Sequence, residues 1–126
     1  MIKSVYVNRW LFLLCFLLSN VFTAFAQDAD RLRAQHIYEW LVAGQGDSIY
    51  VALNKELQGK LSSAMFNDTF RDTEKTFGKL QSKSDWQTEV VQGFTLYYSD
   101  LKFERYSLRL ILAFDTDGAM NTIRLA

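Results

Sequence analysis

One histidine and one carboxylate share a spacing that could serve acid–base or metal chemistry. His36 and Glu39 are three residues apart, so on a helix their side chains lie on one face. Such a pair could act as a general base with an orienting acid, or supply two metal ligands. A metal site requires three or four ligands, and the chain has no second histidine and one cysteine, Cys15. We therefore expect a surface or boundary histidine beside a carboxylate, no metal site and no cofactor.

Aromatic residues and one acid form the candidate binding pocket. In an alternating strand, Asp100 shares a face with Phe94, Leu96 and Tyr98, and Tyr97 points the opposite way. An Asp base with tyrosine donors in an apolar cavity is the arrangement of some isomerases. The alternative is a bend at Ser99 and Asp100 that turns the carboxylate outward. The candidate pocket residues are Tyr38, Trp40, Trp86, Tyr98 and Asp100.

Several other chemistries lack their motifs. Residues 115–118 have the Asp-x-Asp-Gly pattern of half a calcium loop, but the remaining ligands are absent, and a tight turn explains the pattern. There is no G-x-S-x-G nucleophile elbow. Fourteen basic and fourteen acidic residues are interspersed, which argues against a nucleic-acid partner. Asp47-Ser48-Ile49 fits either a helix N-cap or an acceptor for bacterial O-glycosylation.

The first 26 residues have the composition of an export signal. Lys3 and Arg9 precede an apolar run over residues 10–18. Ala24-Phe25-Ala26 has the A-x-A pattern of a cleavage site before Gln27. A membrane-spanning helix requires about 20 apolar residues, more than this run contains. An uncleaved N-terminal anchor is the alternative to a cleaved signal. We predict cleavage after Ala26, a periplasmic or secreted protein, and membrane contact only through the signal peptide before cleavage.

Cleavage would change the composition of the remaining chain. Cys15 lies within the predicted signal. A lipobox has a small residue directly before its cysteine, and Leu14 stands there, so we do not expect lipidation of Cys15. Residues 27–126 contain no cysteine, which excludes thiol chemistry. Because Lys3 and Arg9 are also removed, 12 basic residues stand against 14 acidic ones, a net charge of −2. A chain of this length buries roughly 65% of its unfolded surface, enough for one modest core in a single domain.

Helical spacing dominates the first half of this domain. Asp28 or Asp30 can cap a first helix, and residues 44–46 (Gly-Gln-Gly) end it. Asp47 or Ser48 can cap a second helix that runs to Leu61. A third helix, starting at Ser62 or Ser63, carries the clearest apolar stripe of the chain. The stripe consists of Phe66, Phe70, Thr73, Phe77 and Leu80.

The second half alternates apolar and polar residues and predicts four antiparallel strands. They cover residues 86–91, 94–104, 106–115 and 119–125, after a polar connector at residues 81–85. The third strand is expected to be central, because both of its faces contain apolar residues. Helices followed by hairpin-connected strands form an α+β layer arrangement. We predict two or three N-terminal helices packed on a four-stranded antiparallel sheet.

The order of these signals resembles a bacterial family of unknown function. The resemblance rests on the signal peptide, the helix break at residues 44–47, Phe77-Gly78-Lys79-Leu80, and the hairpin of residues 114–118 with Ile123 beyond it. It covers about residues 30–126. Members of this family are common in Bacteroidetes and occur alone after a signal peptide or N-terminal to an α/β-hydrolase. The resemblance implies a cystatin-like or nuclear-transport-factor-2-like fold with a curved sheet, and it supplies no catalytic residues.

These observations favour an exported binding module without catalysis. We expect it to take a small ligand or a protein partner on the concave face or at the open end of the sheet. One alternative is an interaction or dimerisation partner of a separate α/β-hydrolase. A second is an isomerase-like enzyme with Asp100 or His36 as base, which requires that residue to be buried in a cavity. A homodimer formed through the sheet is compatible with either binding role.

Overall fold

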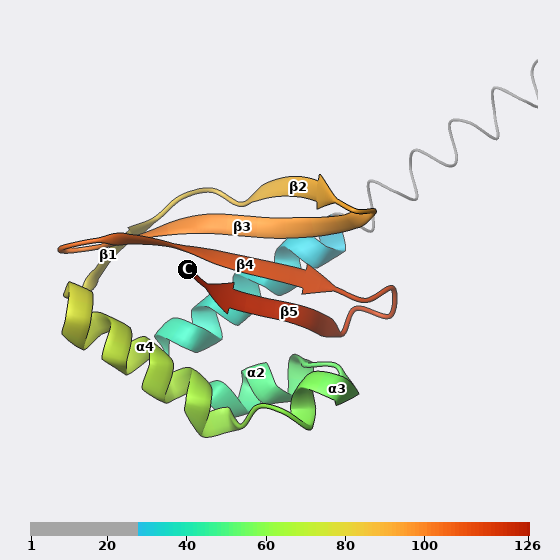
Figure 1. Cartoon of the computed structure of the whole chain (residues 1–126), viewed down its shortest axis with the longest axis horizontal. Helices are drawn as coiled ribbons and strands as arrows, with labels where there is room; N and C mark the ends of the chain where they lie inside the picture. Colours follow the sequence, from blue (N-terminus) through green and yellow to red (C-terminus); the bar gives the residue numbers. More distant parts are fainter. Residues whose placement is uncertain (1–27) are drawn as a thin grey trace, which may run out of the picture. The chain divides into compact units, whose positions relative to one another are not determined.

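The computed structural model describes residues 28–126, of which residues 31–126 form one compact unit. The predicted signal peptide, with Ala24, Ala26 and Gln27, lies outside the described residues. Residues 28–42 are helical. They are followed by α2 (Gly46–Ala52), α3 (Lys55–Gln58) and α4 (Ser63–Phe77), and then by β1 (Leu80–Lys83), β2 (Gln87–Val91), β3 (Phe94–Phe103), β4 (Ser107–Phe114) and β5 (Met120–Leu125) (Figure 1). No helix among the described residues combines the length and apolarity that a membrane span requires.

All strand pairs of the sheet are antiparallel, and the strand order is β1-β3-β4-β5. β2 also pairs with β3, along the same edge as β1. The predicted α+β fold is confirmed, and so is the central position of the strand that became β4. The sheet has five strands rather than four, because residues 80–83, predicted largely as a connector, form β1. Polar residues are typical of an edge strand, which explains why its pattern resembles a loop.

β1 and β2 are separated by a bulge. Residues 84–86 lie opposite only two residues of β3, Ser99 and Asp100. The buried Ser99 hydroxyl donates to the Ser84 carbonyl at 2.6 Å, and the Asp100 amide donates to the Ser84 hydroxyl at 2.8 Å. The bulge turns Trp86 inward, where only 8% of it is exposed.

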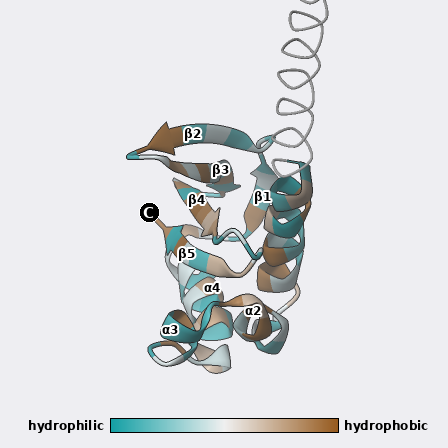
Figure 2. Cartoon of the chain, turned by 90° about the vertical axis from the view of Figure 1, so that its right-hand side faces the viewer, coloured by the Kyte–Doolittle hydropathy of each residue, from teal (hydrophilic) through white to brown (hydrophobic). Residues whose placement is uncertain are grey.

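The core lies between one face of the sheet and the helices, which gather on that side (Figures 1 and 2). The phenylalanine stripe of α4 faces this core, as its spacing predicted. Alternation on β3 directs Tyr97, Leu101 and Phe103 inward. The remaining buried hydrophobic residues of this cluster are Ala34, Ile37, Leu41, Ile49, Leu53, Phe66, Phe70, Trp86, Leu110, Leu112 and Met120.

The second predicted helix is divided in two. α2 begins at Gly46, so Asp47 lies in its first turn rather than at the cap, and the Gly46 amide donates to Asn67 Oδ1 of α4 at 3.0 Å. Leu53 leaves the helix to form a bridge with Met120, whose carbonyl accepts from the Asn54 amide at 2.8 Å. Asn54 then caps α3. Pairing with β5 overrides the continuous helical spacing of the sequence.

Candidate functional site

The five predicted pocket residues do not form one pocket. Tyr38 and Trp86 both lie at the core, each with its ring near the Lys83 ammonium. Trp40 stacks instead on His36, with 5.8 Å between the ring centres. Tyr98 and Asp100 lie on the outer face, because the inward residues of β3 are the odd-numbered ones from Tyr97. The five residues therefore lie at three separate places in the fold and not in the single pocket that the sequence predicted.

Asp100 belongs to an exposed ion pair. Its carboxylate accepts from the Arg109 guanidinium at 2.8 Å, and the guanidinium lies 4.4 Å from the Tyr98 ring centre. The hydrogen bond to Asp100 raises the pKa of Arg109. The side chains of Asp100 and His36 are 51% and 49% exposed. The isomerase alternative required one of them to be buried in a cavity, and neither is.

Lys83 joins Tyr38 and Trp86 into a cation–aromatic cluster. Its ammonium lies 4.8 Å from the Trp86 ring centre and 5.4 Å from that of Tyr38, and it donates to the Ser84 carbonyl at 2.7 Å. Burial lowers the pKa of Lys83, with an opposing effect of Asp85, and burial raises the pKa of Tyr38. The Trp86 indole donates to Gln35 at 2.8 Å. These contacts fasten the bulge to the first helix and occupy the faces of both rings.

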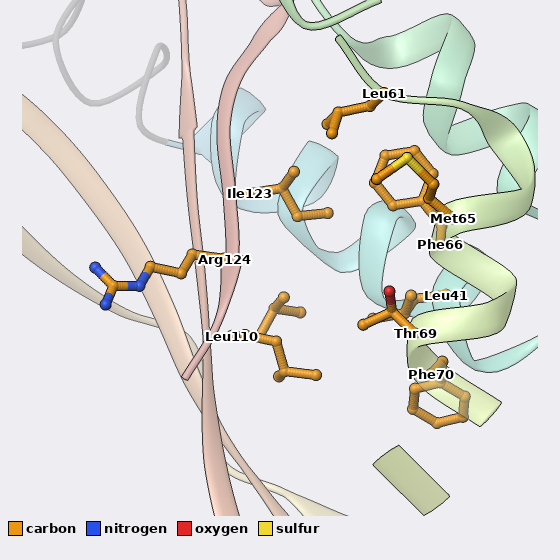
Figure 3. Close-up of a pocket in the computed structure, with 10 residues that line it drawn as sticks. Leu41, Leu61, Met65, Phe66, Thr69, Phe70, Leu110, Ile123 and Arg124 are labelled. Carbon is orange, nitrogen blue, oxygen red and sulfur yellow. The ribbon is translucent and has the colours of Figure 1, made fainter. Parts of the chain in front are cut away.

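An open apolar cavity lies between α4 and the last two strands. We call it the α4–β5 groove, and its volume is about 160 Å³. In Figure 3, Ile123 projects from the strands toward Met65 and Phe66, and Leu110 lies across from Thr69. Its full lining is Leu41, Leu61, Met65, Phe66, Thr69, Phe70, Leu110, Ile123, Arg124 and Leu125.

The α4–β5 groove has the chemistry of a binding site for an apolar group. Thr69 is its one uncharged polar lining residue, and the charged head of Arg124 points away from the opening in Figure 3. No acid or histidine lines it. A cavity of about 150 Å³ holds a benzene ring, whereas sites for drug-sized molecules measure about 300–1,000 Å³. The groove therefore suits one small ring, a branched alkyl group or an apolar side chain.

Sequence reasoning did not identify the groove, although part of its signal is visible. Met65 and Thr69 form a second row on α4 beside the predicted stripe through Phe66 and Phe70. A helix face that is wider than its core contact indicates an additional surface to be covered. No local pattern marks Ile123 as a lining residue of the groove. Its position there depends on β5 being the last strand of the sheet and facing α4.

The residue types that ligate metal ions are scattered over the described part of the chain. Among residues 28–126, no cluster of three or more histidine, cysteine, aspartate or glutamate side chains could hold a metal ion. Asp115, from the half calcium motif, instead accepts from Asn54 and Asn121 at 3.2 and 2.8 Å. These bonds tie the β4–β5 turn to the start of α3.

Comparison with known proteins found one family. A family model described as "Protein of unknown function (DUF3887)" matches residues 34–122. The match begins in the first helix and ends within β5. Searches of the curated proteins and of the solved structures found no match.

Proposed function

Since the chain belongs to the DUF3887 family of unknown function, we propose that it is an exported binding module whose site is the α4–β5 groove. The proposed module performs no catalysis. It holds an apolar group of a ligand or partner in the opening between α4 and β5. We further propose a bacterial origin and the curved-sheet fold of cystatin-like or nuclear-transport-factor-2-like proteins, both implied by the sequence resemblance.

The observation that carries this proposal is an apolar cavity that remains open to solvent. Leu110 beneath it is 1% exposed, whereas Met65 at its rim is 46% exposed. Filling the cavity removes apolar surface from water at about 25 cal/mol per Å². Because no acid or histidine lines the groove and the charged head of Arg124 points away from it, binding is the chemistry that we propose for it.

Methyl NMR with a small apolar probe tests the proposal. Toluene has the size of the cavity, and a hydrocarbon of this kind should bind with a Kd of about 1 mM. We expect titration to shift the methyl resonances of Met65, Ile123 and Leu125. The methyls of Val51, which is 76% exposed and does not line the groove, should stay in place.

A matched pair of variants on α4 provides the control. Thr69→Phe places a ring in the groove and should abolish the toluene-dependent shifts. Thr76→Phe makes the same exchange at an exposed position outside the groove and should preserve them. Equal shifts at Val51 and Ile123, or undiminished binding by the Thr69→Phe protein, would contradict the proposal.

A further inference from the structure

The residues that line the groove also present their backbone at a free sheet edge. Arg109 and Ala126 exchange two backbone hydrogen bonds, at 2.7 and 3.0 Å, so they form a hydrogen-bonded pair of the antiparallel ladder. Such pairs alternate with non-hydrogen-bonded pairs. Leu125 and Ile123, which lie opposite Leu110 and Leu112, therefore direct their N–H and C=O groups away from β4.

No other strand covers this edge in the described part of the chain. β5 is the last strand of the sheet, and its only further pairing is the bridge between Met120 and Leu53. Within residues 28–126, neither Ile123 nor Leu125 forms a backbone hydrogen bond on the open side. A strand added here would pair with these two residues, and its side chains opposite them would lie on the same face of the sheet as the groove.

The positive charge of Arg124 at this edge indicates which residue type a partner strand would carry. Arg124 lies between Ile123 and Leu125, and its side chain is on the outer face of the sheet. Within the described residues no carboxylate forms an ion pair with it, whereas Arg109 is neutralised by Asp100. The residue of an added strand that lies opposite Arg124 would stand beside this unpaired guanidinium.

We propose that the α4–β5 groove receives an extended peptide segment of a partner protein in which an acidic residue lies between two apolar ones. This inference rests on the proposed binding function. The segment pairs with the edge of β5, one of its apolar side chains fills the groove, and its acid binds Arg124. A small free ligand would pair with neither the edge of β5 nor the exposed Arg124. A second copy of β5 offers no acid, because Met120–Leu125 contains none.

Three synthetic peptides test this proposal by fluorescence anisotropy. The first is Ser-Thr-Leu-Glu-Leu-Thr-Ser, the second has Lys in place of Glu, and the third is the first with both leucine amides N-methylated. We expect the Glu peptide to bind at least fivefold more tightly than the Lys peptide. N-methylation should weaken binding at least tenfold, because it removes the hydrogen bonds that the leucine N–H groups donate to the carbonyls of Ile123 and Leu125, without changing the side chains.

A charge exchange in the protein gives the sharper result. Arg124→Glu should reverse the preference, so that the Lys peptide binds more tightly. Lys102→Glu alters an exposed cation on the outer face of β3, away from this edge, and should leave the preference unchanged. Retained circular dichroism and unfolding midpoints establish that both variants are folded.

The outcomes separate this inference from the function on which it rests. Equal affinity for the Glu and Lys peptides, insensitivity to N-methylation, or no peptide binding at millimolar concentration would overturn it. If toluene still shifts the groove methyls in those cases, the groove binds apolar ligands without strand addition. A concentration-dependent dimer that excludes the peptides would identify a second copy as the occupant and equally overturn the inference.

Discussion

Trp86 shows how one residue couples the sheet edge to a helix. The bulge at residues 84–86 turns its ring into the core, and the indole N–H reaches Gln35. Among the described residues, no buried side-chain nitrogen or oxygen lacks a hydrogen-bond partner. Since an unpaired buried polar atom costs about 1–3 kcal/mol, this pairing makes the junction specific.

Replacing Trp86 with Phe should therefore destabilise the fold. The exchange removes the donor to Gln35 and part of the buried ring, and we expect a loss of about 1–3 kcal/mol in the free energy of unfolding. Urea unfolding followed by circular dichroism measures it. Val90→Ala, at a position 70% exposed, should remain within about 0.5 kcal/mol of the unmodified protein. Equal midpoints for the two variants would show that the indole contact contributes nothing.

Lys83 predicts a pH dependence with a defined sign. Burial lowers the pKa of Lys83 from its ordinary 10.5, so between the lowered value and 10.5 the unfolded state binds more protons. The contribution of Lys83 to the free energy of unfolding therefore rises with pH in that window and is lost as pH falls through the lowered pKa. Tyr38 acts oppositely: burial raises its pKa above 10.0, so its contribution falls as pH rises above 10.0.

Lys83→Arg isolates this effect, because arginine keeps a cation beside both rings and does not titrate. As the pH rises toward 10.5, the free energy of unfolding of the unmodified protein should rise relative to that of the variant. Urea unfolding at several pH values provides the comparison, and ¹³C NMR of the lysine side chain provides the pKa directly. A constant or falling difference would exclude a lowered pKa for Lys83.

At the scale of elements, α2 and α4 approach each other at a glycine. A Cβ on Gly46 would collide with the Ser63 carbonyl oxygen and lie 3.0 Å from Asn67 Oδ1. Gly59, beside α3, is exposed, and a Cβ there would come no closer than 3.5 Å to another atom. Both have negative φ, so the two positions differ in space rather than in backbone conformation.

The same substitution should have opposite effects at these two glycines. Gly46→Ala is expected to cost about 1–3 kcal/mol, because the helices must separate. Gly59→Ala is expected to stabilise the protein by about 0.4–1 kcal/mol, because it restricts the unfolded chain without a clash. Thermal and urea unfolding measure both changes. A neutral Gly46→Ala would contradict the close approach of α2 and α4.

Sequence periodicity predicted the elements that carry enough local signal. The stripe of α4 from Phe66 to Phe77 and the alternation of β3 and β4 correspond to strong periods, and these elements form as expected. The division of α2 from α3 was not predictable locally, since it follows from the bridge between Leu53 and Met120. Alternation shows which residues of β3 share a face, but it does not show which face packs on the core. For that reason the sequence did not show that Asp100 lies on the outer face.

Within the compact unit of residues 31–126, the two edges of the sheet differ in how well they are protected against pairing with a further strand. The β1–β2 edge carries a bulge and the anchored Lys83, features that disfavour pairing with another strand. The β5 edge is regular over residues 122–125 and borders the apolar groove. This asymmetry supports the proposed peptide-binding surface at the edge of β5, which no local motif predicts.

Export is the prediction that concerns the whole chain. The basic start, the apolar run over residues 10–18 and Ala24-Phe25-Ala26 predict cleavage after Ala26. The compact unit begins at Arg31 and the family match at residue 34, so cleavage would leave the fold and the groove complete. We expect expression of the full sequence in a bacterial host to yield a periplasmic or secreted protein that starts at Gln27, identified by intact mass and N-terminal sequencing.

A pair of leader variants distinguishes cleavage from retention as an anchor. Ala26→Arg places a bulky charge at the cleavage site and should leave the uncleaved chain associated with the membrane, because a signal peptidase requires a small residue there. Ala29→Arg, beyond the site, should be processed normally. Protein of full mass in the membrane fraction from the unmodified sequence would instead establish an anchor. In that case the proposed peptide-binding edge would operate at a membrane surface.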